Sequence, residues 1–302
     1  FTGDPPATEA DLPVIDASAL GDRHIDLTGG ATLTLRGLRL VDGSAPGGEN
    51  GGAVRSTALS ELNVEWSLFR FNNARGGGAI NASATTLSIV DSHFHQNSST
   101  DLFGSAIRIT GTNSNVAVRR SSFIDNRGMN GRQLLFVNIN SSRLENVTID
   151  GEETGPPAPG VFACHGLQIN AGDDHVLRNV TITEHSFFGA CGGLIVSNLD
   201  ANDSLFVANS VMANGIASCI IEDSPAADIA IAQSMIDTNN GCSTFYDDVT
   251  TDAAELGGLN LDADRITWSR RPDGGLANVV DRGIPEDLSL SDPDLACTAA
   301  DQ

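Results

Sequence analysis

Apolar and polar residues alternate along this chain with a period of two, in blocks that recur every 25 to 33 residues, with a mean of 28. The clearest block is Leu62 to Ile80, LNVEWSLFRFNNARGGGAI, where Phe69 and Asn72 form an F-x-x-N pair. Strict copies occur at Phe94/Asn97 and Phe123/Asn126, and looser ones at Leu40/Gly43, Ile149/Glu152, Ile182/His185, Val211/Asn214 and Ile236/Asn239. A period of two is that of a β-strand, so the pattern predicts a series of short strands.

A second apolar column confirms the repeat. It lies five residues before each reference position, at Leu35, Val64, Ile89, Val118, Leu144, Leu177, Phe206 and Ile231. Repeats of this length with Gly, Asn and Ser turns and no helical stripe are typical of a solenoid of parallel strands. We therefore predict an all-β fold, a right-handed parallel β-helix of about eight coils with about 28 residues each.

Stacked coils place each column residue above its counterpart, because neighbouring parallel strands lie roughly 4.8 Å apart. Phe and Ile then form the core. The Asn residues form a ladder of amide-to-amide hydrogen bonds, as stacked side chains do in cross-β structures. The predicted ladder residues are Asn72, Asn97, Asn126, Asn214 and Asn239.

The chain divides into three regions by composition. Residues 1–30 contain scattered acidic residues and three prolines, and they predict an N-terminal cap, which a solenoid needs at its open end. Residues 31–245 carry the coil pattern. Residues 246–302 lack an F-x-x-N pair and predict irregular terminal coils and an acidic C-terminal cap.

The 302 residues include 39 acidic and 17 basic side chains, all of the basic ones Arg, for a net charge of −22. Nucleic acid and anionic membranes need cationic surfaces, so the charge argues against both as partners. The sequence also lacks the run of about 18 apolar residues that a membrane-spanning helix requires. We expect no membrane insertion by this chain.

The five Cys residues lie in the second half of the chain. Cys164 and Cys191 are 27 residues apart, which is one coil, and stacked neighbours fall within the Cα separation of a disulfide. We predict this disulfide and a second one between Cys219 and Cys242, with Cys297 unpaired within this chain. Disulfides form in oxidising compartments, so the predicted location is extracellular or on the outer cell surface.

A glycine-rich element accompanies the F-x-x-N pair, as Gly51-Gly52-Ala53-Val54 and Gly77-Gly78-Ala79-Ile80. Together they resemble the polymorphic outer-membrane-protein repeat of bacterial surface proteins. The resemblance implies a right-handed β-helix displayed by autotransport and a role in adhesion, and it supplies no catalytic residues.

Some β-helix enzymes cleave polysaccharides, which makes an enzyme the alternative. His165, Asp173, Asp174 and His175 are similar to elements of polygalacturonase-like enzymes, but the His-Gly element comes first and the R-I-K element is missing. Paired catalytic carboxylates must also flank a sugar at about 5 to 9.5 Å. We predict no catalytic residues, with a polysaccharide lyase or glycosidase on these four residues as the alternative.

No metal site or cofactor is predicted, and calcium is the one ion to weigh. Asp247, Asp248, Asp262 and Asp264 offer oxygen ligands but lack the spacing of a calcium loop. The predicted function is therefore that of an adhesin, glycan-binding or structural element, with a carbohydrate or protein surface as partner. End-to-end self-assembly is a further hypothesis, because open coils expose strand edges.

Overall fold

A computed structural model describes residues 12–100, 104–128, 132–151, 166–183, 192–212, 217–222, 228–236, 239–240 and 246–250. The first half contains β1 (Val14–Asp16), β2 (Ile25–Leu27), β3 (Thr32–Arg36), β4 (Arg39–Val41), the 3₁₀ helix η2 (Pro46–Gly48), β5 (Val54–Ser56), β6 (Glu61–Glu65), β7 (Leu68–Arg70), β8 (Asn73–Ala74), β9 (Ile80–Ser83), β10 (Thr86–Val90), β11 (His93–His95), β12 (Ser98–Ser99), β13 (Ile107–Thr110), β14 (Asn115–Ile124), β15 (Arg127–Gly128) and β16 (Arg132–Asp150). The second half contains β17 (Gly166–Thr183), β18 (Gly192–Ser197), β19 (Ser204–Ala208), β20 (Val211–Met212), β21 (Ala217–Glu222), β22 (Asp228–Ile236), β23 (Asn239–Asn240) and β24 (Tyr246–Thr250).

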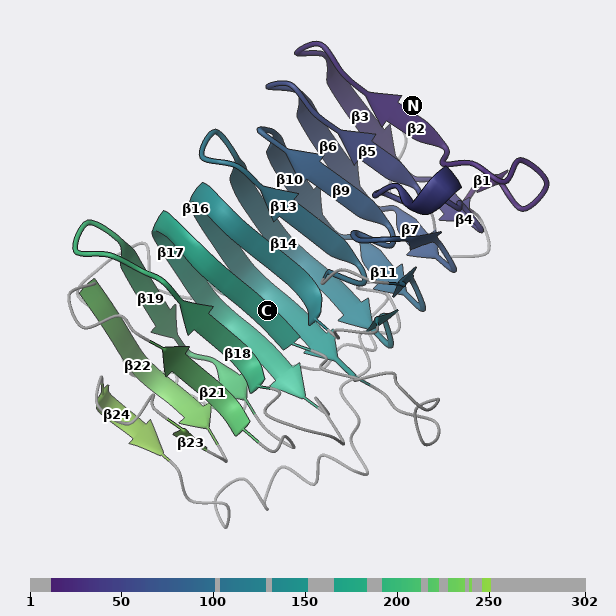
Figure 1. Cartoon of the computed structure of the whole chain (residues 1–302). Coiled ribbons are helices and arrows are strands. Elements are labelled where there is room, and N and C mark those ends of the chain that lie inside the picture. The colour runs from purple at the N-terminus through teal and green to yellow at the C-terminus, as the bar shows by residue number, and fades with distance from the viewer. Residues whose placement is uncertain are drawn as a thin grey trace, which may run out of the picture.

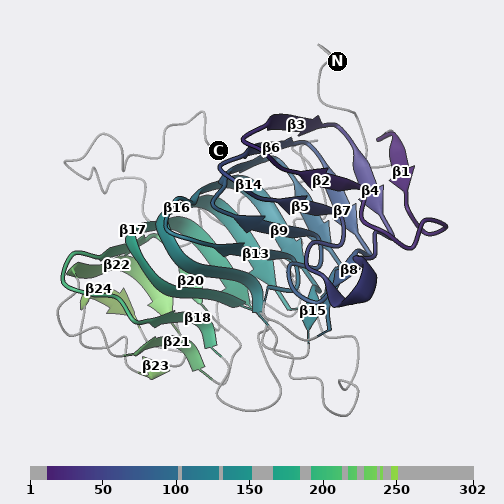
Figure 2. The same ribbon diagram turned by 45° about the horizontal axis from the view of Figure 1, so that its top comes forward.

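The strands stack in one direction, from the N-terminal to the C-terminal part of the described chain (Figures 1 and 2). Each strand pairs in parallel with its counterpart one coil later, as in β4 with β7 and β7 with β11. The result is an all-β solenoid of about six turns, which confirms the predicted fold class. Eight coils and right-handed winding stay predictions.

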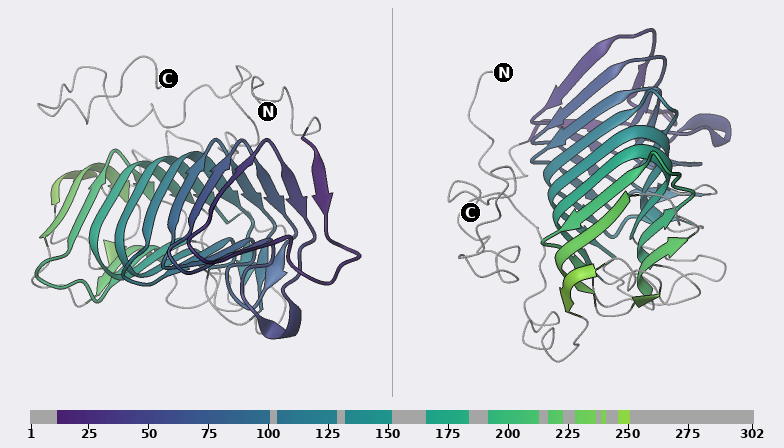
Figure 3. Two further views of the ribbon diagram at one scale, coloured as in Figure 1. Left: turned by 90° about the horizontal axis from the view of Figure 1, so that it is seen from above. Right: turned by 90° about the vertical axis from the view of Figure 1, so that its left-hand side faces the viewer.

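Each coil has three faces, which are seen from the side and from one end in Figure 3. Face A consists of residues 32–36, 61–65, 86–90, 115–119, 141–145, 174–178 and 204–208. Face B consists of residues 39–41, 68–70, 93–95, 122–124, 148–150 and 181–183. Face C consists of residues 25–27, 54–56, 80–82, 107–109, 134–136, 167–169 and 194–196.

The core is built from columns of apolar side chains that stack in register. The Phe69, Phe94 and Phe123 rings are fully buried, with successive centroids 4.7 and 4.9 Å apart and planes tilted by 6° and 16°. The whole column runs through Leu40, Phe69, Phe94, Phe123, Ile149, Ile182, Met212 and Ile236. A continuous dry column of this kind stabilises each coil only when its neighbours are present.

The predicted register is wrong by one residue in the coil of β19 and β20. Val207 pairs with Leu177, in place of Phe206, and Met212 pairs with Ile182, in place of Val211. Phe206 and Val207 are both apolar, so alternation alone did not decide which points inward. The predicted ladder residue of this coil, Asn214, lies outside the described residues.

A ladder of buried amides runs beside the Phe column. Asn72 Nδ2 donates to Asn97 Oδ1 at 2.9 Å, and Asn97 Nδ2 donates to Asn126 Oδ1 at 2.8 Å. The same Asn97 oxygen accepts the backbone N–H of Asn72, and its Nδ2 also donates to the Phe69 carbonyl. Gln133 extends the ladder, because its Oε1 accepts from Asn126 Nδ2 at 2.6 Å and its Nε2 donates to the Asp150 carbonyl at 2.8 Å. The side chain of Asn239 is not among those described.

Serine side chains mark the corner between faces A and B. Ser67 Oγ donates to the Glu65 carbonyl at 2.8 Å, and Ser92 Oγ donates to the Val90 carbonyl at 2.8 Å. Each hydroxyl oxygen also accepts a backbone N–H from the preceding coil, as in Ser67 N–H to Ser92 Oγ at 3.2 Å. One small side chain thus satisfies two backbone groups that the turn removes from the strand ladder.

The first strands already belong to the solenoid. β1 pairs with β4 and β2 pairs with β5, in the same register that the later coils follow. A separate cap over residues 1–30 is therefore not confirmed, and residues 1–11 lie outside the described part of the chain. The predicted C-terminal cap falls mostly on residues 251–302, which also lie outside it.

The amide ladder predicts the effect of an Asn97→Ala substitution. The change leaves the Asn72 amide, the Phe69 carbonyl and the Asn126 oxygen each without one buried partner, so it should lower the free energy of unfolding by about 1 to 3 kcal/mol. Asn73→Ala is the matched control, because Asn73 is only half-buried and bonds to Ser98 outside the core. Urea unfolding of both variants measures the difference, and equal stabilities would show that the ladder does not matter.

Candidate functional site

The residues of the enzyme alternative do not converge. His175 is fully buried, and it pairs in register with Ser142 and Leu205 on the inner side of face A. Asp173 and Asp174 are exposed, and Asp174 Oδ1 accepts a hydrogen bond from Ser204 at 2.7 Å. His165 lies outside the described residues. Because the imidazole is inside the solenoid and the carboxylates are outside it, these three residues cannot act on one substrate.

His175 instead fills a place in an apolar column. Its Nδ1 lies 2.9 Å from Ser142 Oγ, within hydrogen-bonding distance, and the corresponding residues of earlier coils include Leu87 and Val116. Burial lowers the pKa of His175 to about 4, against a slight opposing effect of the nearby Asp174 and Asp173 carboxylates. Folding therefore favours the neutral imidazole.

This burial predicts an acid-dependent loss of stability. The folded pKa lies below the ordinary value of 6.5, so the contribution of His175 is complete above about pH 6.5 and is lost as the pH falls towards 4, by about 3 kcal/mol at most. A Ser142→Ala/His175→Leu variant should remove this part of the pH dependence. Urea unfolding between pH 4 and 6.5 measures it, with the outward-facing His95→Leu as control; an unchanged slope in the double variant would contradict the prediction.

Neither the predicted disulfides nor the calcium candidates can be placed from the described side chains. Cys164, Cys191, Cys242, Asp262 and Asp264 lie outside the described residues, as do the side chains of Cys219, Asp247 and Asp248. The backbone of Cys219 pairs with Asn239, three residues before Cys242. Leu167 and Leu194, which follow Cys164 and Cys191 by three residues each, are register partners. Among the described residues, no three His, Cys, Asp or Glu side chains gather in a way that could hold a metal ion.

Face A carries more exposed outward side chains than the other two faces, although most of its outward side chains are half-buried. Thr32, Thr34, Glu61, Thr86 and Asp174 are exposed there. Several outward residues of the other faces are buried, including Leu68, Ser122, Thr148 and Thr181 on face B and Asn81, Leu135 and Ile195 on face C, while Arg70, His93 and Arg108 are half-buried and Asp26 is exposed. Face A therefore offers the most accessible long surface in the described part of the chain.

Hydroxyl, amide and carboxylate groups repeat along face A at the spacing of the coils. The column formed by the first residue of each face A segment contains Thr32, Glu61, Thr86, Asn115, Ser141, Asp174 and Ser204. Several of them bond to one another, as in Ser141 Oγ to Asn115 Oδ1 at 2.9 Å. Such a surface presents regularly spaced donors and acceptors over roughly 30 Å, the length of six strand spacings.

Three arginines of face A are paired with carboxylates. Arg36 Nε lies 3.4 Å from Glu65, and Arg119 Nε lies 2.9 Å from Glu145. Arg143 Nε contacts the same Glu145 side chain at 2.5 Å. These contacts balance the positive charge of the three arginines with negative charge.

A ridge of four side chains borders face A at its corner with face B. The Arg36 guanidinium lies 4.3 Å from the Trp66 ring centroid, and Trp66 Nε1 donates to Asp91 Oδ2 at 3.0 Å. Arg120 binds the same carboxylate through two nitrogens, at 2.8 and 2.9 Å. We call Arg36, Trp66, Asp91 and Arg120 the corner ridge; its residues come from four successive coils.

The corner ridge occupies backbone positions that disfavour large side chains. The residue at the equivalent corner position, which precedes a serine in four coils and Leu38, Val147 or Val180 in the others, has a positive φ at Gly37, Trp66, Asp91, Arg120, Asn146, Asn179 and Asn209. Gly and Asn adopt this left-handed conformation readily, whereas Trp66 and Arg120, both at φ 45°, do so at a cost of roughly 1 to 2 kcal/mol each. Strained residues of this kind cluster at functional sites, which makes the corner ridge a candidate binding site.

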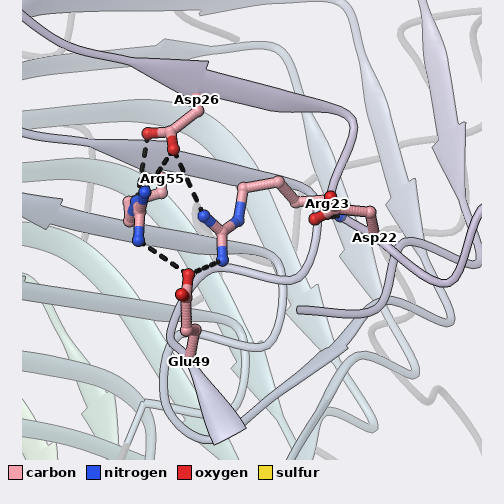
Figure 4. Close-up of polar contacts among 5 residues, drawn as sticks. All are labelled: Asp22, Arg23, Asp26, Glu49 and Arg55. Carbon is pink, nitrogen blue, oxygen red and sulfur yellow. Dashed lines mark hydrogen bonds and ion pairs between the residues drawn. The ribbon is translucent and has the colours of Figure 1, made fainter. Parts of the chain in front are cut away.

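A second charged cluster lies near the N-terminal end, around Arg23 and Arg55 (Figure 4). Both guanidiniums contact Asp26 and Glu49, with Arg55 Nε 3.0 Å from Asp26 Oδ1 and Arg55 Nη1 2.7 Å from Glu49 Oε2. The hydrogen bond from Arg55 lowers the pKa of Asp26, and that from Arg23 lowers the pKa of Glu49. Glu49 directly follows η2, so the cluster fastens this loop to the first two coils and is structural.

Sequence reasoning missed both charged groups, although a signal was present. Arg36 and Glu65, Asp26 and Arg55, and Asp91 and Arg120 are each 29 residues apart. Opposite charges separated by one coil are adjacent once the coils stack. Searching for charge pairs at the repeat spacing would have found them.

The comparisons with known proteins give no match: no family model matches this sequence, and no curated protein or solved structure matches it significantly. The likeness to the polymorphic outer-membrane-protein repeat therefore rests on the two motifs alone. No helix in the described part of the chain is long and apolar enough to cross a membrane.

Proposed function

We propose that this protein is a secreted or surface-displayed β-helix that binds an extended glycan along face A and acts as an adhesin. Right-handed winding, about eight coils and an N-terminal cap belong to the same proposal. So does the family resemblance, which implies surface display.

The observation that carries the proposal is the contrast between face A and the other two faces. Outward residues such as Thr32 and Thr86 on face A are exposed, whereas Thr148 on face B and Asn81 on face C are buried. A linear polysaccharide offers hydroxyl groups at regular intervals, and face A offers polar side chains at regular intervals. The buried position of His175 and the outward position of Asp174 favour binding over catalysis.

Blocking face A should abolish glycan binding. Thr34→Arg and Thr86→Arg place long side chains on exposed positions of this face, and Ser83→Arg is the matched control on the outward side of face C. A glycan array followed by calorimetry with the bound oligosaccharide measures affinity. We expect the two face A variants to bind about tenfold more weakly or worse, and the control variant to bind like wild type. A wild-type protein that binds no glycan would contradict the proposal.

A disulfide between Cys164 and Cys191 supports the extracellular location in this proposal. The two cysteines lie outside the described residues; the proposal rests on their spacing of 27 residues and on the register pairing of Leu167 with Leu194, each three residues after a cysteine. The protein is alkylated with and without prior reduction, and its intact mass is measured. The reduced sample should be heavier by one alkyl group for each cysteine that was in a disulfide. Five alkylated thiols without reductant would contradict both the disulfide and the oxidising compartment.

End-to-end self-association is a second candidate, favoured by the exposed start of the core. Ile15 pairs with Leu40 in the Phe69 column, but its side chain is 42% exposed, while Leu40 is fully buried. Val14 beside it is 47% exposed. Analytical ultracentrifugation would detect such an assembly, and Ile15→Glu should then dissociate it.

A further inference from the structure

Two large side chains, Trp66 and Arg120, occupy the corner position that other coils give to Gly, Asp or Asn. Asn146 and Asn179 show what this position needs for folding alone, because Asn179 Nδ2 donates to Asn146 Oδ1 at 3.0 Å and both adopt a positive φ. Trp66 and Arg120 adopt the same backbone conformation against their preference. The coil does not require their bulk, so a role outside folding explains it better.

The corner ridge presents flat, hydrogen-bonding groups in a row along the solenoid axis. Arg36 lies over the Trp66 ring, Trp66 donates to Asp91, and Arg120 holds the same carboxylate. A sugar ring has apolar C–H faces and hydroxyl edges. Indole and guanidinium planes can stack against the faces, and the charged groups can bond to the hydroxyls.

The charge pairing on this side of the molecule selects the kind of sugar. Arg120 is neutralised by Asp91, and Arg36 lies 3.4 Å from Glu65. The chain as a whole carries a net charge of −22. A polyanion such as a polyuronate would find no excess of cations and would be repelled at long range. A neutral polysaccharide meets no such barrier.

We propose that the corner ridge binds a neutral, extended polysaccharide that runs along the solenoid axis beside face A. This inference rests on the proposed glycan-binding function and adds the position and the class of the ligand. Arg178, which lies 5.7 Å from the Phe206 ring centroid on face A, gives a second arginine-covered aromatic ring further along the same path.

Substitution by the residue that other coils use separates binding from folding. Trp66→Asn and Arg120→Asn should keep the fold, with a melting temperature equal to or above that of wild type, because Asn tolerates the left-handed conformation. The matched control is Phe71→Asn, another aromatic residue with a positive φ, 57°, that is 47% exposed at a different corner. It should leave glycan binding unchanged.

Binding is measured by calorimetry with neutral oligosaccharides, namely cello-, manno- and xylo-oligosaccharides, and with oligogalacturonate and alginate as acidic probes. We expect at least one neutral series to bind, at an affinity that varies little with salt, and both ridge variants to bind about tenfold more weakly, equal to about 1.4 kcal/mol. Acidic probes that bind better than neutral ones, in a salt-dependent way, would overturn the inference.

A second arm distinguishes this inference from the proposed function. If Thr86→Arg on face A abolishes binding while Trp66→Asn and Arg120→Asn bind like wild type, the ridge is structural and only the inference fails. If wild type binds no neutral or acidic glycan, the proposed function fails with it. Loss of binding in the ridge variants, with unchanged melting temperatures, supports both.

Discussion

In-register stacking of successive coils is the constraint on which the rest of this structure depends. A coil of about 28 residues cannot bury its apolar side chains alone, and it acquires a core only when its neighbours place theirs above and below. Two neighbouring columns, three residues apart in each coil, enforce the same register. They are the Phe column of Phe69, Phe94 and Phe123 and the amide ladder of Asn72, Asn97 and Asn126. A slip of one residue would turn every one of these side chains outward and leave the buried amides without partners.

The same register determines the chemistry of the surface. Each outward side chain lies beside the side chain at the equivalent position of the neighbouring coil. Asp91 and Arg120 therefore form an ion pair, because they are one coil apart. The outward groups therefore form columns, and face A, the most accessible face among the described residues, presents those columns side by side. An elongated partner is the natural match for a surface built by repetition.

The sequence predicted the fold class and the Phe column because strict F-x-x-N pairs label three successive coils. The predicted register failed at Phe206 and Val207, because two adjacent apolar residues do not show which of them points inward. The prediction also missed that residues 14–27 belong to the solenoid, because their short strands lack the motif although they pair with β4 and β5. His175 was considered for catalysis because it belongs to a motif similar to that of polygalacturonase-like enzymes, and only the stacking shows that it points inward. The corner ridge was missed because Trp66 and Arg120 depart from the Gly and Asn that usually mark such a corner.

The dependence of affinity on glycan length tests the central claim most directly, because a repeating face should gain contacts with every added sugar. For a series of neutral oligosaccharides of one linkage, measured by calorimetry, we predict that the dissociation constant falls steadily with length until the ligand spans face A, roughly 30 Å. A disaccharide that binds as tightly as the longest oligomer would place recognition in a local pocket and contradict binding along the solenoid.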